Sequence, residues 1–581
     1  MTVETKTQTR TKTKTRTVAI GWQDFAELRK LDAFYVDKTG FIKEWWENMD
    51  QVTLITRPRR FGKTLNLNMV ERFFSRKYEG NGEVFEGLRI WEEEEYRKLQ
   101  GTYPVIFLSF AKVKETKYSQ AVRRIGSIIS NVFSDCSELS ISNSLSEKER
   151  NICNRFSDHI EEEDIADSIS ILCQCLRAHY GEKPIILLDE YDTPMQEAYI
   201  NGYWDEITNL FRNLFNATFK TNPHFYRAIL TGITRVSKES MFSDLNNLEV
   251  VTTTSNKYET SFGFTETEVF TAMDEMGLTE KELVKQWYDG YVFGRTSDIY
   301  NPWSITNYLQ KGEFQPYWAN TSSNALAGNL IQSGSDELKK AFEVLINGGT
   351  IQERIDEQID YGSLKNDSAV YSLLVASGYL KINEYKKMRK DGSQANDRLA
   401  ATLSLTNLES RMVFSRLFEK WFLDTAEHEY NEFVRALLKN DVKLMNIYMN
   451  KITLECMSSF DAGKRPAEKE PERFYHGLVL GLLVTLLDRY EVKSNRESGY
   501  GRYDVMLIPR DRGKDFGIII EFKVRDEDGG EDSLEDTVKA ALAQIEEKQY
   551  EAELLGAGVM RDNIRKYGFA FEGKKVLIGA C

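Results

Sequence analysis

One apolar run near the end of this 581-residue chain contains two charged residues, and it constrains the fold more than any other segment. Ile518-Ile519-Ile520-Glu521-Phe522-Lys523-Val524 has the character of a strand. Residues two apart in a strand point to the same face, so Glu521 and Lys523 share one face. Asp504 opens a second apolar run, Val505-Met506-Leu507-Ile508. If the two runs pair as a hairpin, the carboxylates of Asp504 and Glu521 converge on one point.

Two converging carboxylates indicate a metal site. They repel each other unless a cation lies between them, and a hard divalent ion with oxygen ligands meets that need. Lys523 would then orient a water or stabilise developing phosphate charge, which is the chemistry of metal-dependent phosphodiester cleavage. The alternative is a solvated charged face, the usual meaning of a Glu-x-Lys pair. A second such pair, Glu384-Tyr385-Lys386, is assigned no function.

Asp504, Glu521 and Lys523 resemble the signature of the PD-(D/E)XK nuclease superfamily, with Tyr503 in place of the nominal Pro. The surroundings are also similar, in Glu472 and in segments 497–502 and 544–550. The resemblance implies an α/β nuclease-like domain that acts on DNA or RNA. It also implies that Asp504 and Glu521 bind Mg²⁺, with Mn²⁺ as an alternative, and that both are catalytic together with Lys523.

A second motif follows the first buried strand of the chain, Val52-Thr53-Leu54-Ile55. Residues 57–64, Arg-Pro-Arg-Arg-Phe-Gly-Lys-Thr, come after this strand and open a helix, which is the context of a phosphate-binding P-loop. Gly62 would let the backbone approach phosphates held by amide groups and the helix N-terminus. Lys63 would reach the β and γ oxygens, and Thr64 would hold Mg²⁺. Arg57 occupies the position of the usual first Gly.

Two further strand ends carry polar residues that suit the same chemistry. Asp189 and Glu190 end an apolar strand, and in a P-loop fold the Asp holds Mg²⁺ through water while the Glu polarises the attacking water. Thr231 ends another apolar strand, where it could sense the γ-phosphate or simply form a turn. Arg235 could act as an arginine finger, in its own chain or from a neighbouring subunit of a homo-oligomer, or it could form a structural ion pair.

Residues 18 to about 320 resemble the AAA-ATPase-like family that is often fused to a PD-(D/E)XK domain. The matching stretches are residues 34–39, 57–64, 188–192, 231–238, 288–291 and 300–304. Arg in place of the first Gly is usual in that family. The resemblance implies ATP as the ligand, with Glu190 as the catalytic residue and Mg²⁺ held by Thr64 and Asp189. The implied ATP-binding residues are Arg60, Phe61, Gly62, Lys63, Thr64, Asp189, Thr231 and Arg235.

The order of apolar runs and polar stretches predicts the domain organisation. Strands alternate with helical segments over residues 18–320, which predicts an α/β domain with a parallel sheet covered by helices on both faces. A strand pair is expected near residues 379–384 and 401–405. The expected segments are a disordered Thr/Lys/Arg tail (1–17), the ATPase-like domain (18–320), a mostly helical middle region (321–460), a polar, Pro-containing linker (461–471) and the nuclease-like domain (472–581).

Composition narrows the function classes. The chain has 76 Lys and Arg against 90 Asp and Glu, a net charge of −14, so no global basic field would draw it to nucleic acid. A local basic groove beside Asp504 would be sufficient to bind nucleic acid. No apolar run approaches the ~18 residues that span a bilayer, so we expect no membrane partner. The six Cys lack zinc-ligand or disulfide spacing, which indicates a reducing, cytoplasmic location.

The sequence therefore predicts an enzyme, an ATPase joined to a metal-dependent nuclease. One alternative is a nucleotide-dependent switch that binds a partner and whose C-terminal domain binds nucleic acid without cleaving it. Another is a transport or remodelling ATPase, which no pore-loop or membrane feature supports.

Overall fold

The structure is a computed structural model whose contacts divide the chain into two compact units, residues 1–412 and 413–581. The residues that it describes are 16–236, 241–242, 245–318, 325–332, 334–346, 348–357, 361, 364, 366–387, 398–460, 479, 483, 486, 489–498, 501–526, 531–572 and 575–581. Within these ranges, no helix combines the length and the apolar character needed to cross a membrane.

A five-stranded parallel sheet forms the centre of the first unit, as the alternating pattern predicts. Its order is β2-β3-β4-β1-β5, and every neighbouring pair is parallel. The strands are β1 (Val52–Thr56), β2 (Val105–Ser109), β3 (Ile185–Asp189), β4 (Ala228–Gly232) and β5 (Leu248–Val251). Because β1, β3 and β4 are buried along their whole length, they appear in the sequence as continuous apolar runs.

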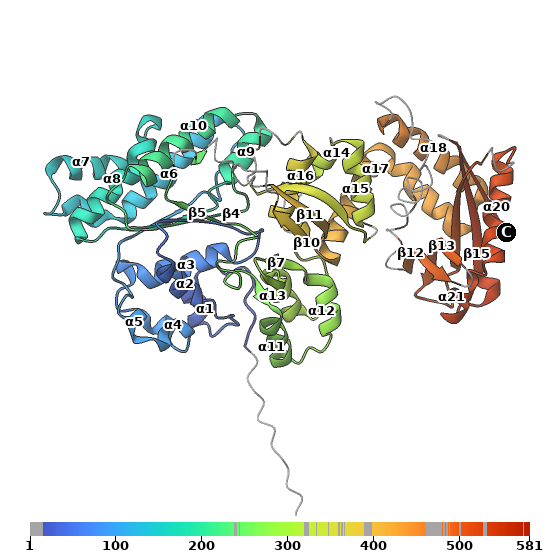
Figure 1. Ribbon diagram of the computed structural model, residues 1–581, viewed down its shortest axis with the longest axis horizontal. Coiled ribbons are helices and arrows are strands. Elements are labelled where there is room, and N and C mark those ends of the chain that lie inside the picture. Colours follow the sequence, from blue (N-terminus) through green and yellow to red (C-terminus); the bar gives the residue numbers. More distant parts are fainter. Residues whose placement is uncertain are drawn as a thin grey trace, which may run out of the picture. The chain divides into compact units, whose positions relative to one another are not determined.

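Helices cover both faces of this sheet (Figure 1). One face carries α1 (Phe25–Lys30), α2 (Gly40–Asn48), α3 (Lys63–Phe74), α4 (Arg89–Glu92) and α5 (Glu94–Arg97). The other carries α6 (Tyr118–Asp135), α7 (Glu147–Asp158), α8 (Glu162–Tyr180), α9 (Thr193–Asn201) and α10 (Trp204–Phe215). Residues Phe41, Trp45 and Phe73 pack with Ile55 and Leu187 of the sheet, so α2 and α3 are fixed against β1 and β3.

Two small antiparallel sheets complete the first unit. The sheet β6-β8-β7 lies among three helices, and the sheet β10-β11-β9 contains the predicted strand pair with β9 added. The elements of the first group are β6 (Phe264–Thr265), α11 (Glu266–Met276), α12 (Lys281–Tyr288), β7 (Tyr291–Phe293), β8 (Thr296–Tyr300) and α13 (Pro302–Lys311). Those of the second are α14 (Ala325–Gln332), α15 (Asp336–Ile346), β9 (Ile351–Asp356), α16 (Asp367–Ala376), β10 (Leu380–Lys387) and β11 (Arg398–Leu405).

The boundary between the units falls inside α17 (Leu408–Lys439), well before the expected linker. The end of α17 and helix α18 (Val442–Phe460) share a core with the C-terminal strands, since Leu437 and Met445 pack in the same cluster as Ile520. These helices of the expected middle region therefore belong to the second unit. The linker 461–471, Glu472 and nearly all of the tail lie outside the described residues, so the predicted linker stays a prediction.

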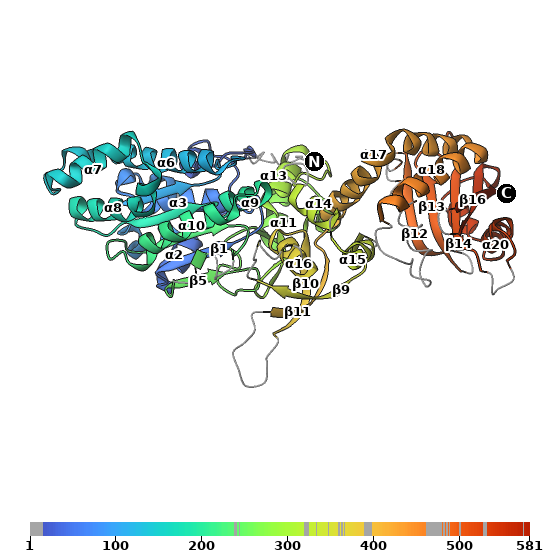
Figure 2. The ribbon, with the colours of Figure 1, turned by 90° about the horizontal axis from the view of Figure 1, so that it is seen from above.

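A mixed five-stranded sheet, β12-β13-β14-β15-β16, organises the second unit (Figure 2). The strands are β12 (Tyr490–Ser498), β13 (Gly501–Pro509), β14 (Gly517–Val524), β15 (Ile564–Glu572) and β16 (Lys575–Ala580). Only β14 and β15 are parallel among the described pairs, and α20 (Leu534–Glu547) lies between them in the chain. Helix α18 covers one face, and α20 with α21 (Glu551–Gly556) covers the other (Figure 1).

The sequence suggests one helix over residues 534–555, but the structure separates α20 from α21 at Gln549. The φ angle of Gln549 is 54°, a left-handed conformation that ends an α-helix. The turn buries Tyr550 beside Ile545 and Leu554. The break between the helices thus accompanies the burial of this aromatic ring.

Two asparagines of α18 pair with β16, the last strand of the sheet as described. Asn446 donates from Nδ2 to the carbonyl of Ile578 and accepts from its N–H, both at 2.8 Å. Asn450 makes the same two bonds with Val576, at 2.7 and 3.0 Å. The side-chain amides thus take the place that the backbone of a further strand would occupy.

Candidate active sites

The loop between β1 and α3 is anchored by Arg57, the residue that replaces the usual first Gly. Its side chain is fully buried, donates to the carbonyls of Thr56 and Thr252 at 2.9 and 2.8 Å, and lies over the Phe293 ring at 4.4 Å. Burial lowers the pKa of Arg57 to about 9. Arg57 therefore anchors the start of the loop to the segment that follows β5 and to the Phe293 ring.

Gly62 and Lys63 lie at the start of α3, where the loop meets the helix. Gly62 precedes α3 with a φ of 78°, a conformation that favours glycine. Lys63 is buried and donates from Nζ to the carbonyls of Arg57 and Pro58 at 2.9 and 2.8 Å. Burial lowers the pKa of Lys63, while the nearby carboxylates of residues 189, 190 and 192 oppose that shift. The ammonium group is thus held inside the loop.

Asp189 forms hydrogen bonds with two other residues of the predicted site, Thr64 and Thr231. Its Oδ2 accepts a bond from the Thr64 hydroxyl and its Oδ1 accepts one from the Thr231 hydroxyl, both at 2.6 Å. Burial raises the pKa of Asp189, and these two hydrogen bonds counteract the rise. The three residues lie close together because β1, β3 and β4 are parallel and end at the same edge of the sheet.

Glu190 follows directly in a left-handed conformation, with a φ of 49°. Such a backbone is uncommon for a residue other than glycine and is often found at functional sites. The Thr193 hydroxyl donates to Oε2 of Glu190 at 3.1 Å, which orients the carboxylate.

The remaining predicted ATP-binding residues differ in exposure and in the groups that they contact. Arg60 is exposed and lies over the Trp303 ring at 4.5 Å. The Phe61 side chain is buried, 4.7 Å from the ring of Tyr291, so of Phe61 only the backbone is suited to binding phosphate. Arg235 is half-buried and lines a small cavity with Thr56 and Glu357, on the side of β5.

Asn301 is a residue of this site that the sequence did not single out by role. It caps α13 by accepting the N–H of Trp303 at 2.9 Å, and its Nδ2 donates to the carbonyl of Arg59 at 3.3 Å. In the sequence, residues 300–304 stand out only as a stretch that resembles the ATPase-like family. This stretch contains an Asn-Pro pair, which is typical of a helix start. Such a pair does not predict that Asn301 contacts the loop between β1 and α3.

The second site lies on the α20 side of the C-terminal sheet. Val505 pairs with Ile520, which brings Asp504 beside Glu521, and the N–H of Phe522 donates to Oδ2 of Asp504 at 2.8 Å. Glu521 is 3% exposed, whereas Asp504 and Lys523 are half-buried. The predicted convergence of the two strands is therefore present.

Helix α20 supplies a partner for Glu521. Gln544 donates from Nε2 to Oε1 of Glu521 and, at 3.2 Å, to the hydroxyl of Tyr550. Burial raises the pKa of Tyr550, and the charges of Glu521 and Asp504 add to the rise. A Cβ on Gly568 would come within 2.9 Å of the carbonyl of Val538, so glycine there permits the close approach of α20.

The donor set fits a hard divalent cation only in part. Asp504 and Glu521 are oxygen donors of the type that Mg²⁺ and Mn²⁺ prefer. Across the described ranges, no three His, Cys, Asp or Glu side chains gather as a metal site. Glu472, which the resemblance places near this site, lies outside those ranges. Two basic residues along the neighbouring edge of the sheet are paired, Arg489 just before β12 with Asp515 and Lys493 of β12 with Glu553.

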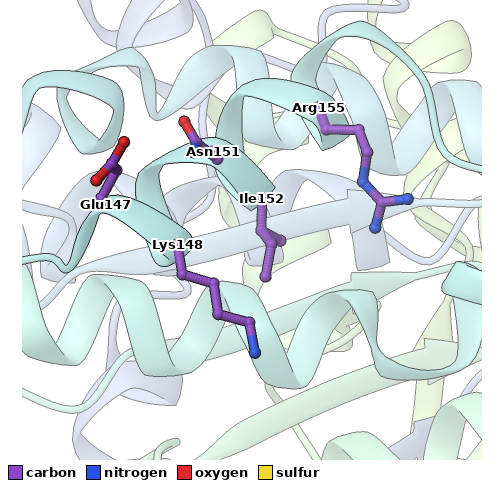
Figure 3. A pocket seen from close by; sticks show the side chains of 5 residues that line it. All are labelled: Glu147, Lys148, Asn151, Ile152 and Arg155. Atoms are coloured by element: carbon purple, nitrogen blue, oxygen red, sulfur yellow. The ribbon is translucent and has the colours of Figure 1, made fainter.

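A hollow on the surface of the first unit contains none of these residues (Figure 3). It runs along α7, and all of its lining residues belong to that helix: Glu147, Lys148, Asn151, Ile152 and Arg155. An open surface formed by one helix provides no converging polar groups, so we assign it no role.

Comparison with known proteins identifies a family for each of two parts of the chain. The family described as predicted AAA-ATPase matches residues 19–242, and the PD-(D/E)XK nuclease superfamily matches residues 470–580. An uncharacterized protein in the vnfD 5' region of Azotobacter chroococcum mcd 1 is 27% identical over 383 residues. The match covers 65% of this chain and 66% of that relative. The chain therefore joins an AAA-ATPase-like domain to a C-terminal domain of the PD-(D/E)XK nuclease superfamily.

Proposed function

We propose that this protein hydrolyses ATP in its first unit and cleaves DNA or RNA in its second. The observation that carries the ATPase half is the bonding of Asp189 to Thr64 of α3 and to Thr231 at the end of β4. A hydroxyl and a carboxylate are oxygen donors that suit Mg²⁺, so Thr64 and Asp189 would hold the ion.

Each neighbouring group would have its own task in hydrolysis. Backbone amides around Gly62 and the N-terminus of α3 would bind the phosphates. Lys63 would exchange the carbonyls of Arg57 and Pro58 for phosphate oxygens, since an ammonium group gains more from an anion than from a neutral acceptor. Glu190 would accept a proton of the attacking water at its carboxylate. Bound Mg²⁺ would neutralise phosphate charge.

The nuclease half rests on the pairing of β13 with β14. Asp504 and Glu521 lie on neighbouring strands, and they would bind Mg²⁺ or Mn²⁺, which would polarise the phosphodiester. Lys523 shares the face of Glu521 and would donate to the attacking water or to an oxygen of the scissile phosphate. Gln544 would hold the Glu521 carboxylate in its orientation.

The two activities would be linked in one chain in the cytoplasm. ATP binding at Lys63 and Thr64 would control the access of nucleic acid to Asp504 and Glu521. Arg235 would reach the γ-phosphate in its own subunit or in a neighbouring subunit of a homo-oligomer. Sedimentation with and without ATP distinguishes these two cases.

A cleavage assay on the full chain tests the proposal. Single- and double-stranded DNA and RNA are incubated with Mg²⁺ or Mn²⁺, in the presence of ATP, a non-hydrolysable ATP analogue or no nucleotide, and phosphate release is followed in parallel. Cleavage supported by ATP but not by the analogue indicates that hydrolysis drives the reaction, whereas equal support indicates control by binding.

The same assay separates the proposal from its rival. Hydrolysis of ATP without cleavage of any substrate would favour a nucleotide-dependent switch whose C-terminal domain binds nucleic acid. A lack of both activities in folded protein would overturn the proposal. Lys63→Ala and Glu521→Ala serve as the controls for the two sites.

A further inference from the structure

A buried carboxylate beside the nucleotide site has no task in the proposed reaction. Asp192 follows Asp189 by three residues and is 1% exposed. Its Oδ2 accepts the N–H groups of Ile233 and Thr234 at 3.0 and 2.8 Å and the Thr234 hydroxyl at 2.8 Å. A carboxylate that only accepts hydrogen bonds is favoured in its ionised form, although burial raises the pKa of Asp192.

Asp192 holds the chain where it leaves β4. A Cβ on Gly232 would lie 2.7 Å from Oδ1 of Asp192, so glycine is required for the strand end to pass this close. Thr231, which bonds to Asp189, precedes the segment that Asp192 binds, and Arg235 follows it. The direction of both residues therefore depends on the position of this short segment.

Gln196 connects the same carboxylate to the P-loop. It lies on α9, one turn after Asp192, and donates from Nε2 to Oδ2 of Asp192 at 3.2 Å. Its Oε1 accepts a bond from the guanidinium of Arg59, also at 3.2 Å. The loop that would bind phosphate and the segment after β4 are thus joined through two side chains.

A third connection comes from a residue far along the chain. The hydroxyls of Thr234 and Tyr361 are 3.1 Å apart, and because the Thr234 hydroxyl already donates to Asp192, Tyr361 is the donor. The Tyr361 ring is buried between Tyr199 and Trp204, at 5.7 and 5.3 Å. Tyr361 lies beyond residues 19–242, which the ATPase-like family matches.

We propose that Asp192 is a positioning residue of the nucleotide site and that Tyr361 completes its support. The inference rests on the proposed ATP hydrolysis. Asp192, which bonds to Gln196, Ile233 and Thr234, would contact neither the nucleotide nor the attacking water. It holds the P-loop and the segment that follows β4 in a fixed relative position. Small displacements of catalytic groups reduce turnover more than binding.

The test uses matched variants of the full chain. Asp192→Asn keeps the shape and removes the charge, and Tyr361→Phe removes only the hydroxyl. Asp205→Asn is the control, since Asp205 is exposed on α10 of the same unit. We expect Asp192→Asn to lower kcat about tenfold and Tyr361→Phe about threefold, with KM for ATP changed less than about threefold in both.

Two measurements separate positioning from a loss of folded protein and from independent effects of the two substitutions. Thermal unfolding gives the folded fraction, to which each kcat is normalised. The double variant is expected to lose less than the product of the single losses, because both changes act through Thr234.

Three outcomes would overturn the inference. Normalised kcat values of Asp192→Asn and Tyr361→Phe equal to that of Asp205→Asn would exclude positioning, even with ATP hydrolysis intact in the unaltered protein. A rise in KM with kcat unchanged would assign these residues to ground-state binding. Absence of hydrolysis in the unaltered, folded protein would instead refute the proposed function, and this inference with it.

Discussion

The two candidate sites place their acids in different parts of a sheet. In the first unit, Asp189 lies at the end of β3, where parallel strands finish together. In the second unit, Glu521 lies within β14, on a face that α20 covers. The first arrangement draws its partners from neighbouring strand ends and loops, and the second draws them from a helix packed across the sheet.

This difference determines which groups donate hydrogen bonds to each carboxylate. Asp189 receives two hydroxyl groups at 2.6 Å, one at each carboxylate oxygen, so the site is preorganised by short side chains. Glu521 is held by the amide of Gln544, whose approach depends on the glycine at position 568. A strand-end site thus depends on local loop geometry, whereas a mid-strand site depends on helix packing.

The largest expected effect concerns the strand-end site. Lys63→Ala is expected to lower ATP hydrolysis by about 10³-fold or more and to weaken nucleotide binding, because it removes the cation placed to meet the phosphates. Glu190→Gln should keep nucleotide binding and lose turnover. Phosphate release and binding of a fluorescent ATP analogue measure both. Wild-type hydrolysis by Lys63→Ala, compared with the exposed control Lys114→Ala, would refute the P-loop assignment.

The mid-strand site should respond to its own substitutions without loss of ATP hydrolysis. Asp504→Ala and Glu521→Ala are expected to remove cleavage and to weaken Mn²⁺ binding, whereas Lys523→Ala should remove cleavage alone. Ca²⁺ should support nucleic-acid binding but little cleavage, because it tolerates looser geometry than Mg²⁺. Calorimetric titration with Mn²⁺ beside a gel assay tests this. Unchanged Mn²⁺ affinity in both carboxylate variants would contradict the proposed site.

Gln544→Ala tests the dependence of the second site on its helix. We expect a loss of about 10- to 100-fold in Mn²⁺ affinity or cleavage, typical for a residue that orients a ligand. Glu547→Ala, at an exposed position of the same helix, is the control. Equal activity of the two variants would show that Glu521 needs no support from α20.

Arg57→Met tests whether the first site depends on the geometry of the loop between β1 and α3. The variant leaves the carbonyls of Thr56 and Thr252 without their charged donor, at an expected cost of about 2–3 kcal/mol in unfolding free energy. The KM for ATP should change little, since Arg57 does not face the phosphates. Urea unfolding measures the first quantity, and a larger effect on KM than on stability would place Arg57 in the site after all.

The smallest expected effect is a pH dependence confined to the first unit. Burial, with the charge of Asp298 nearby, raises the pKa of Asp289 to about 7 from 3.8. A raised pKa means that the folded state holds the proton more tightly, so this contribution to stability is present below pH 3.8 and is lost as the pH rises through 7.

Asp289→Asn should remove this dependence. Its unfolding temperature relative to the unaltered protein is expected to rise by a few degrees between pH 4 and pH 7 and to stay constant above that range. Thermal unfolding of both proteins across the range provides the measurement. A difference that shrinks as the pH rises would contradict the assignment.

Much of the fold could be predicted because buried parallel strands are local apolar runs. The runs that became β1 and β3, and the polar residues that end them, follow from this rule. The half-buried β5 has no such run, and its existence depends on pairing with β1. Contacts such as Gln544 with Glu521 depend on the register and on the glycines that permit close packing, which no local pattern encodes.

A repeated tripeptide pattern illustrates the same limit. Glu384 and Lys386 form a Glu-x-Lys pair on β10, and Glu521 and Lys523 form one on β14. The first pair is exposed, whereas Glu521 is buried under α20. Only the second follows a run of three isoleucines, so the apolar context, rather than the charged pair, distinguished the candidate site.

Asn446 and Asn450 have a consequence for how the second unit behaves in isolation. A strand at the edge of a sheet can recruit a strand from another molecule and so begin aggregation. The two asparagines already occupy the outward backbone groups of Val576 and Ile578. A shortened protein that began at residue 470, where the nuclease superfamily match begins, would lack α18 and would expose that edge. Helix α18 therefore closes the edge at which a strand of another molecule could pair.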